Sequence, residues 1–151
     1  MTAPTQPRKT LRADARHLVA GCAGWNSRFA ARRITQFLDH ELSDTGLSAA
    51  QIGLMAQIAA AEDDTLGALA RRSGLDQSTL SRNLRTLENE ELVEITVVEA
   101  DLRRRTVWLT EAGARRLEAA IPVWRKAQAK LQQQLSPDLA RRLAAEAETL
   151  N

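Results

Sequence analysis

The amino-acid sequence predicts a mainly α-helical fold with one small β-hairpin, and three observations support this fold class. Alanine, leucine and arginine dominate the composition, while tyrosine is absent, a balance that favours helices. Apolar residues recur at alternating spacings of three and four along most of the chain, as in helices that pack against other helices. Between Val93 and Leu109 the apolar period falls to two, which predicts a pair of antiparallel strands.

The composition limits the class of protein further. The 151 residues are 44% hydrophobic and 26% charged, which fits a globular chain of about one domain. We find neither a membrane-spanning run nor an apolar signal segment, so we expect a cytoplasmic protein without a membrane partner. A lone cysteine, Cys22, and two isolated histidines offer no disulfide and no recognisable metal site. With no cofactor motif and no catalytic cluster, an enzyme is the least favoured class.

The N-terminal part of the chain begins with a polar stretch. Residues 1–10 contain two prolines and predict a disordered arm. The apolar stripe that follows predicts one long helix over about Leu11–Leu42. Ser48, with Gln51 three residues later, matches a capping box and predicts the start of the next helix.

The C-terminal part of the chain is also helical by its apolar spacing. Thr110 and Glu111 open a second long helix, in which Pro122 should introduce a kink because proline removes one N–H and clashes with the preceding turn. Ser136 and Pro137 restart a last helix.

The stretch Ala68–Leu87 has the spacing of two helices that cross at a sharp angle. Such a crossing needs a small residue, a turn residue that tolerates positive φ and an apolar residue that fills the angle. Ala70, Gly74 and Leu80 supply these three, and Asp76 caps the second helix. The face of the second helix opposite its leucines carries side chains suited to base edges and phosphates, namely Gln77, Ser78, Ser81, Arg82 and Arg85. This face predicts a DNA-reading helix, and a merely solvated helix face is the plainer alternative.

The predicted hairpin after this helix favours the DNA-reading interpretation. Asp101, Arg103 and Arg104 fall at or near its tip, where a wing inserts arginine into the minor groove. The alternative is an exposed edge strand that charge protects from aggregation. We prefer the wing because the hairpin directly follows a helix-turn-helix.

These motifs together resemble the MarR family of winged-helix transcription regulators. The resemblance covers about Leu11–Leu135 and is most specific in TLGALARRSGLDQSTLSRNLRTLENEELVE and in ADLRRRTVWLTEAG. It implies recognition-helix roles for Ser78, Thr79, Ser81 and Arg82, and it implies that Asp101 holds the wing while Arg103 enters the minor groove. Family members usually have glycine where Glu91 stands. Either Glu91 adopts the positive φ that glycine favours, or the helix ends differently, near Asn89.

The resemblance also implies a homodimer and a regulatory signal. Relatives bind small aromatic ligands in a crevice between the dimerisation helices and the winged domain, and the residues that would line it are Trp25, Asn26, Phe29, Met55 and Trp124. Plain core packing is the alternative for each apolar one. Some relatives sense peroxide through a cysteine in the first helix, a region comparable to that of Cys22. This cysteine lies on the apolar stripe, however, and a buried thiol has little reactivity.

The sequence therefore predicts a non-enzymatic, sequence-specific DNA-binding regulator, a ligand-responsive repressor that acts as a homodimer on a pseudo-palindromic operator. Its expected parts are the disordered arm (1–10), a helical dimerisation region (11–47 and 111–151) and a winged helix-turn-helix domain (48–110). Two alternatives remain: a thiol-based redox regulator acting through Cys22, and a helical protein-interaction module that does not bind DNA.

Overall fold

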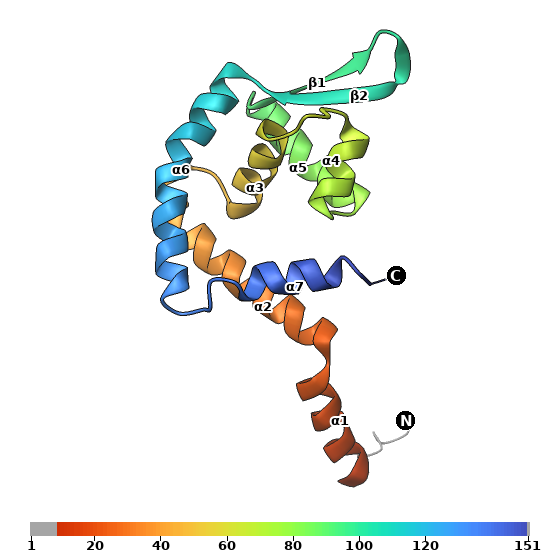
Figure 1. The fold of residues 1–151 in the computed structure, drawn as a ribbon, viewed down its shortest axis with the longest axis vertical. Helices are drawn as coiled ribbons and strands as arrows, with labels where there is room; N and C mark the ends of the chain where they lie inside the picture. The colour runs from red at the N-terminus through yellow and green to blue at the C-terminus, as the bar shows by residue number, and fades with distance from the viewer. Residues whose placement is uncertain (1–8, 151) are drawn as a thin grey trace, which may run out of the picture. The chain divides into compact units, whose positions relative to one another are not determined.

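The computed structural model describes residues 9–150 (Figure 1). They divide into two compact units on either side of the Gln36–Phe37 bond. We describe each unit by itself. Most of the predicted N-terminal arm, residues 1–8, lies outside the described residues. Its last part is not disordered as predicted, because the first helix already begins at Lys9.

The first unit corrects the prediction of one unbroken helix over Leu11–Leu42. Two helices are found instead, α1 (Lys9–Gly21) and α2 (Ala23–Glu41), separated at Cys22. Asn26 stabilises the break, because its side-chain Nδ2 donates to the carbonyl oxygen of Ala20 at 2.9 Å and so satisfies a carbonyl near the end of α1. The glycines that flank Cys22 weaken the helix locally.

The second unit is mainly helical with one two-stranded sheet, as the sequence predicts. After the end of α2 and a 3₁₀ turn (Ser43–Thr45), its elements are α3 (Ala49–Ala59), α4 (Leu66–Ser73), α5 (Gln77–Asn89), β1 (Val93–Val98), β2 (Asp101–Leu109), α6 (Glu111–Gln132) and α7 (Leu139–Ala147). The α6 helix is continuous through Pro122. Within residues 9–150, no helix combines the length and apolar character needed to cross a bilayer.

One core holds this unit together. Most of its completely buried side chains come from α3, α4, α5 and both strands, among them Met55, Leu69, Leu87, Val93 and Val107. The core also takes in apolar side chains outside the span 48–110, namely Leu42, Leu47, Leu117 and Ala120. Packing therefore continues past both ends of the predicted winged domain.

Local capping fixes where these helices start. Ser48 and Gln51 form the predicted capping box, with the Gln51 amide donating to Ser48 Oγ at 3.1 Å and the Ser48 amide donating to Gln51 Oε1 at 2.8 Å. Thr65 caps α4 and Thr110 caps α6 through their hydroxyl oxygens. Each cap satisfies a backbone N–H that has no partner within its helix.

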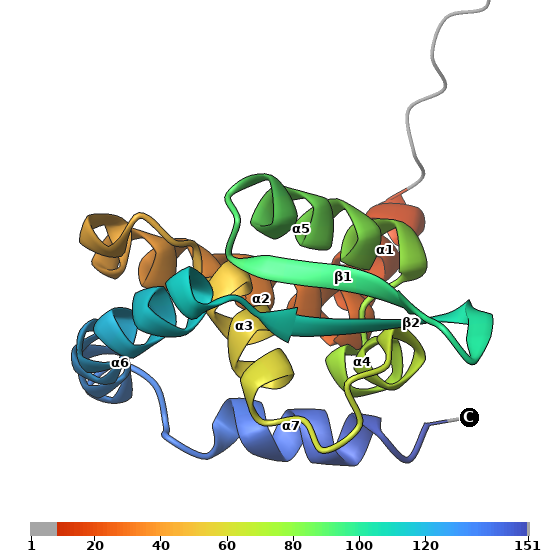
Figure 2. The ribbon, with the colours of Figure 1, turned by 90° about the horizontal axis from the view of Figure 1, so that it is seen from above.

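The hairpin is antiparallel and irregular near its tip. Val93 pairs with Leu109 and Ile95 with Val107, so the predicted apolar residues share one face. Beyond Val97 the register shifts, because Val97 pairs with Arg105 whereas Val98 pairs with Asp101. Residues 102–104 therefore bulge from β2. Figure 2 looks onto the hairpin, with β1 beside α5 and β2 beside α4.

The chain leaves α5 through a left-handed residue. Glu91 has φ of 57°, and it is the one non-glycine residue with positive φ in the described part of the chain. Its amide donates to the Glu88 carbonyl at 2.9 Å, and the Leu92 amide donates to the Leu87 carbonyl at 2.9 Å. This pair of bonds forms a Schellman motif. The first possibility is confirmed: Glu91 adopts the positive φ, just after a helix whose last residue is Asn89.

We expect Glu91→Gly to raise the free energy of unfolding by about 1 kcal/mol, because glycine accepts this φ without a Cβ clash. Chemical denaturation at fixed protein concentration measures the change. Glu90→Gly is the matched control, because Glu90 has φ of −86° and glycine there only adds chain entropy to the unfolded state. A Glu91→Gly protein no more stable than the wild type would contradict the strain argument.

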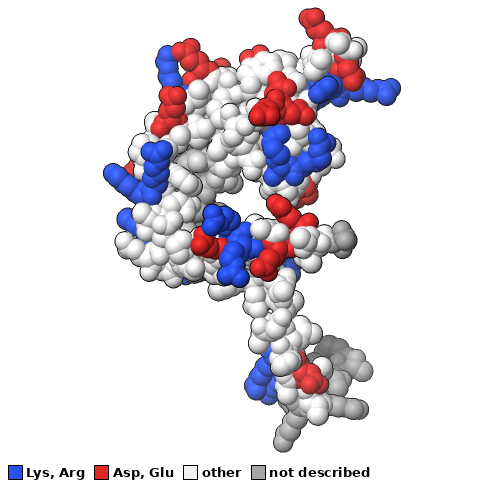
Figure 3. Space-filling view, viewed as in Figure 1, with Lys and Arg blue, Asp and Glu red and all other residues white. Residues whose placement is uncertain are grey.

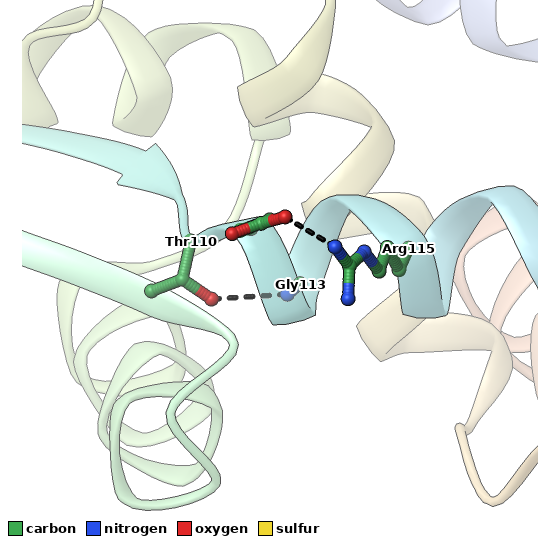
Figure 4. A network of polar contacts seen from close by, with 4 residues as sticks. Thr110, Gly113 and Arg115 are labelled. Carbon is green, nitrogen blue, oxygen red and sulfur yellow. Dashed lines mark hydrogen bonds and ion pairs between the residues drawn. The ribbon is translucent and has the colours of Figure 1, made fainter.

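The start of α6 is joined tightly to the end of α5. Figure 4 shows the bond between Thr110 and Gly113 at this start. Thr110 Oγ1 donates to the Glu91 carbonyl at 2.6 Å and accepts the Gly113 amide at 3.0 Å. The Thr110 amide donates to the Leu92 carbonyl at 3.1 Å. Gly113 is buried directly against that same carbonyl, and a Cβ at this position would overlap its atoms. Residues 109–113, the Leu-Thr-x-x-Gly end of the stretch ADLRRRTVWLTEAG, therefore form a close backbone crossing that anchors the hairpin to α6.

Candidate nucleic-acid interface

Two short helices and a three-residue turn build the centre of the candidate interface. Gly74, which has φ of 63°, is the C-cap of α4, and Asp76 is the N-cap of α5. In the turn, Ser73 Oγ donates to the Ala70 carbonyl and accepts the Leu75 amide. Leu80 is 4% exposed in the core, so the predicted helix-turn-helix geometry is confirmed.

The outward face of α5 carries the predicted polar and basic side chains. Leu80, Leu84 and Leu87 are buried, and the opposite face forms an open groove of about 750 Å³. Six exposed residues line this groove: Asp76, Gln77, Ser78, Ser81, Arg82 and Arg85. The structure thus brings together every DNA-contact residue predicted on α5 except Thr79, which is half-buried.

Asp76 organises the start of this helix. Its Oδ1 accepts from Ser78 Oγ at 2.9 Å and from the Thr79 amide at 2.9 Å, and its Oδ2 accepts from Thr79 Oγ1 at 2.7 Å. Thr79 and Ser78, predicted only as recognition residues, therefore also serve to cap α5. The hydrogen bonds from the Thr79 amide and hydroxyl, followed by that from Ser78, lower the pKa of Asp76 from 3.8 to about 2.

We expect the Asp76 carboxyl to titrate with a midpoint near 2 when it is followed by NMR. Because its folded pKa lies below the ordinary value of 3.8, the capped helix start contributes its full stability above about pH 4 and loses it as the pH falls through about 2. Thr79→Ala removes the hydroxyl donor but keeps the amide, so the pKa of Asp76 should rise toward 3.8. A wild-type midpoint near 4 would show that these bonds do not hold the carboxylate in solution.

The wing places a second set of basic residues beside α4. Asp101 Oδ1 accepts the Arg103 amide at 3.1 Å, which fixes the backbone of the bulge. Arg103, Arg104 and Arg105 line an open hollow of about 410 Å³ together with Asp101 and residues 65–67 at the start of α4. Sequence reasoning missed Arg105 here. The available signal was its spacing: Arg105 is two residues from the buried Val107 on β2, so both side chains lie on the face of the strand that turns toward the core.

The root of the wing is tied to the loop before α4. The Val107 amide donates to the Asp64 carbonyl at 2.9 Å, and Thr65 forms a bridge with Thr106. Hydrogen bonds from the side chain and then the backbone of Thr65 hold the pKa of Asp63 below its usual value. These contacts make β2 and the start of α4 a joint support for the wing.

Positive and negative side chains are separated over this surface. In Figure 3, basic side chains gather over α4 and at the outer end of the hairpin, with acidic side chains between them. Arg71 and Arg72 are exposed on α4, and the acidic residues 62–64 form the loop that precedes it. Such separation lets a segment with little net charge present a local positive field.

The remaining predicted site residues are divided between the two units. Trp25 and Phe29 are each 55% exposed in the first unit, where the Asn26 amide is engaged at the helix break. Met55 is completely buried in the core of the second unit, and Trp124 is 39% exposed on α6. Cys22 lies at the break between α1 and α2 with intermediate exposure, so it is not buried as predicted from the apolar stripe.

Comparison with known proteins places this geometry among regulators. The model of the MarR family matches residues 45–104. The transcriptional regulator HosA of Escherichia coli is 39% identical over 84 residues, and the match spans 56% of this chain and 61% of the length of HosA.

Solved structures match over more of the chain. The M. tuberculosis transcriptional regulator MosR, crystallised in complex with DNA, is 34% identical with a TM-score of 0.74, over 85% of this chain and 99% of MosR. A MarR variant from E. coli in complex with operator DNA has a TM-score of 0.72 over 87% of this chain and 94% of its own, at 23% identity. The second likeness supports the fold alone.

Proposed function

We propose that this chain, which belongs to the MarR family of winged-helix transcription regulators, is a repressor that binds a pseudo-palindromic DNA operator as a homodimer. The family consists of transcription regulators and not of enzymes. One observation carries the proposal. The outward face of α5, with Arg82 and Arg85, lies in the same unit as a wing that carries three consecutive arginines. Such a surface suits the major groove together with the flanking backbone or minor groove.

The proposed dimer has support in the apolar side chains that the single chain leaves exposed. On α7, Leu139 is 57% and Leu143 is 52% exposed. On α1, Leu11 is 56% and Leu18 is 67% exposed. Burial of such a leucine stabilises by about 1.5 to 3 kcal/mol, so a second copy that covers both helices is the arrangement we favour. The two α5 helices would then read half-sites about one helical turn, roughly 34 Å, apart.

A signal would act by changing the fraction of dimers whose α5 helices have this spacing. We propose a small aromatic ligand as that signal. The partial exposure of Cys22 at a helix break favours oxidation of its thiol as the second candidate. A regulator of this kind acts on chromosomal DNA, which supports a cytoplasmic location.

Selection from a random duplex library tests the proposal and identifies the operator in the same experiment. We expect the full-length protein to enrich a two-fold symmetric sequence and to bind it at least about 1,000-fold more tightly than a scrambled duplex. Light scattering should give two chains per duplex. Enrichment of no sequence, with binding that does not depend on salt, would instead favour the protein-interaction module.

A further inference from the structure

At the start of α5, the side chains of Asp76, Ser78 and Thr79 form a cluster of hydrogen-bond acceptors with no free hydroxyl proton. A serine or threonine hydroxyl has one proton to donate and two lone pairs to accept with. The Ser78 proton is directed at Asp76 Oδ1 and the Thr79 proton at Asp76 Oδ2. Because the Asp76 carboxylate is itself an acceptor, Ser78 Oγ is left with only its lone pairs for a third partner.

The two arginines of the groove have the opposite polarity. Arg82 and Arg85 line the same groove as Asp76 and Ser78, and a guanidinium group only donates. From Ser78 to Arg82 the helix rises about 6 Å, which is less than two base-pair steps at about 3.4 Å each. The spacing therefore allows the Asp76–Ser78 acceptor cluster and Arg82 to reach neighbouring base pairs.

Base edges in the major groove differ in this respect. Cytosine N4 and adenine N6 carry amino groups that donate, whereas guanine O6 and N7 and thymine O4 only accept. Phosphate oxygens also only accept, so the carboxylate of Asp76 disfavours a phosphate at this end.

We propose that Ser78 is a specificity-determining residue that accepts a hydrogen bond from the exocyclic amino group of a cytosine or adenine in the operator. Asp76 enforces this role by holding the Ser78 proton away from the DNA. Arg82, one helical turn on, takes a guanine within two base pairs of that amino group. This inference rests on the proposed function, since it assigns a base contact within the same interface.

Ser81 provides a matched control on the same face. Its side chain lines the groove, and among residues 9–150 its hydroxyl has no protein hydrogen-bond partner. Ser81 is therefore free to donate or to accept, and we expect it to tolerate either kind of base edge.

The experiment uses the full-length protein and the sequence enriched from the random library. The amino group is removed from one selected base at a time, with 2-pyrimidinone in place of cytosine or purine in place of adenine. We expect one such position per half-site to lose about fivefold to tenfold in affinity, the value of one hydrogen bond of about 1 to 1.4 kcal/mol. Ser78→Ala should abolish this discrimination, so that both duplexes bind equally, whereas Ser81→Ala should keep it.

A second variant tests the part assigned to Asp76. Asp76→Gly removes the carboxylate, and glycine costs only a few tenths of a kcal/mol at an N-cap. Ser78 then regains a free proton, so we expect selection at the same position to admit thymine or guanine.

Three outcomes would overturn the inference. In the first, the wild-type protein binds its selected operator, but its affinity does not change when any amino group is removed. This result overturns the inference and leaves the proposed function standing. The same holds if Ser78→Ala keeps the wild-type discrimination. A wild-type protein that selects no sequence overturns both. The base-analogue series needs no variant, so the test stands even if a substitution impairs folding.

Discussion

Arg103→Ala should weaken binding to every operator sequence by about 30- to 150-fold, because each dimer loses two arginines that contribute about 1 to 1.5 kcal/mol each. Asp101 holds the Arg103 amide, so the bulge presents this exposed side chain from a fixed backbone. The slope of log K against log salt should become shallower by about 2. Each arginine that is removed leaves one phosphate charge unneutralised, so binding releases about one counterion fewer from the DNA.

Fluorescence anisotropy over a salt series measures both quantities. Arg115→Ala is the matched control, because it removes the same charge from an exposed arginine that pairs with Glu111 on α6 (Figure 4). We expect it to leave affinity and slope unchanged. Arg82→Ala should instead alter which base pairs are preferred. Unchanged affinity for Arg103→Ala at both low and moderate salt would rule out a wing contact.

The elements predicted correctly depend on short-range rules. Gly74, Asp76 and the Ser48–Gln51 pair act within one turn of chain, so their residue types suffice to place helix ends. The hairpin follows equally directly from a period of two around Val107. The recognition face was predictable for the same reason, because burial of three leucines fixes the opposite side of α5.

Other features depend on contacts that spacing does not encode. The apolar stripe runs through Cys22 without interruption, yet the helix breaks there because the Asn26 side chain supplies a local alternative to the helical bonds. The bulge in β2 shifts the register after Val97, which a count of alternating residues cannot detect. Which group receives the Ser78 proton is set by the rotamers of three neighbouring side chains, and it determines what the helix start can recognise.

At Gly113, a tertiary contact decides whether any side chain larger than glycine fits. In the sequence this glycine appears only as the last residue of the stretch ADLRRRTVWLTEAG, since its neighbour in space, Leu92, is 21 residues earlier (113 − 92). The Leu92 carbonyl accepts the Thr110 amide and lies directly beneath Gly113. This carbonyl cannot withdraw without breaking that bond, and Glu91 beside it is already strained.

We therefore expect Gly113→Ala to lower the free energy of unfolding by at least about 3 kcal/mol, because the new methyl group must displace backbone on both sides of the crossing. For a chain of this size that corresponds to a fall in Tm of about 6 to 12 °C, measured at fixed protein concentration because a dimer's Tm depends on it. Gly53→Ala is the control. Gly53 lies exposed within α3 with nothing near its would-be Cβ, so alanine should stabilise the protein by up to about 1 kcal/mol. Equal effects of the two substitutions would mean that helix propensity alone, and not the crossing at Leu92, governs Gly113.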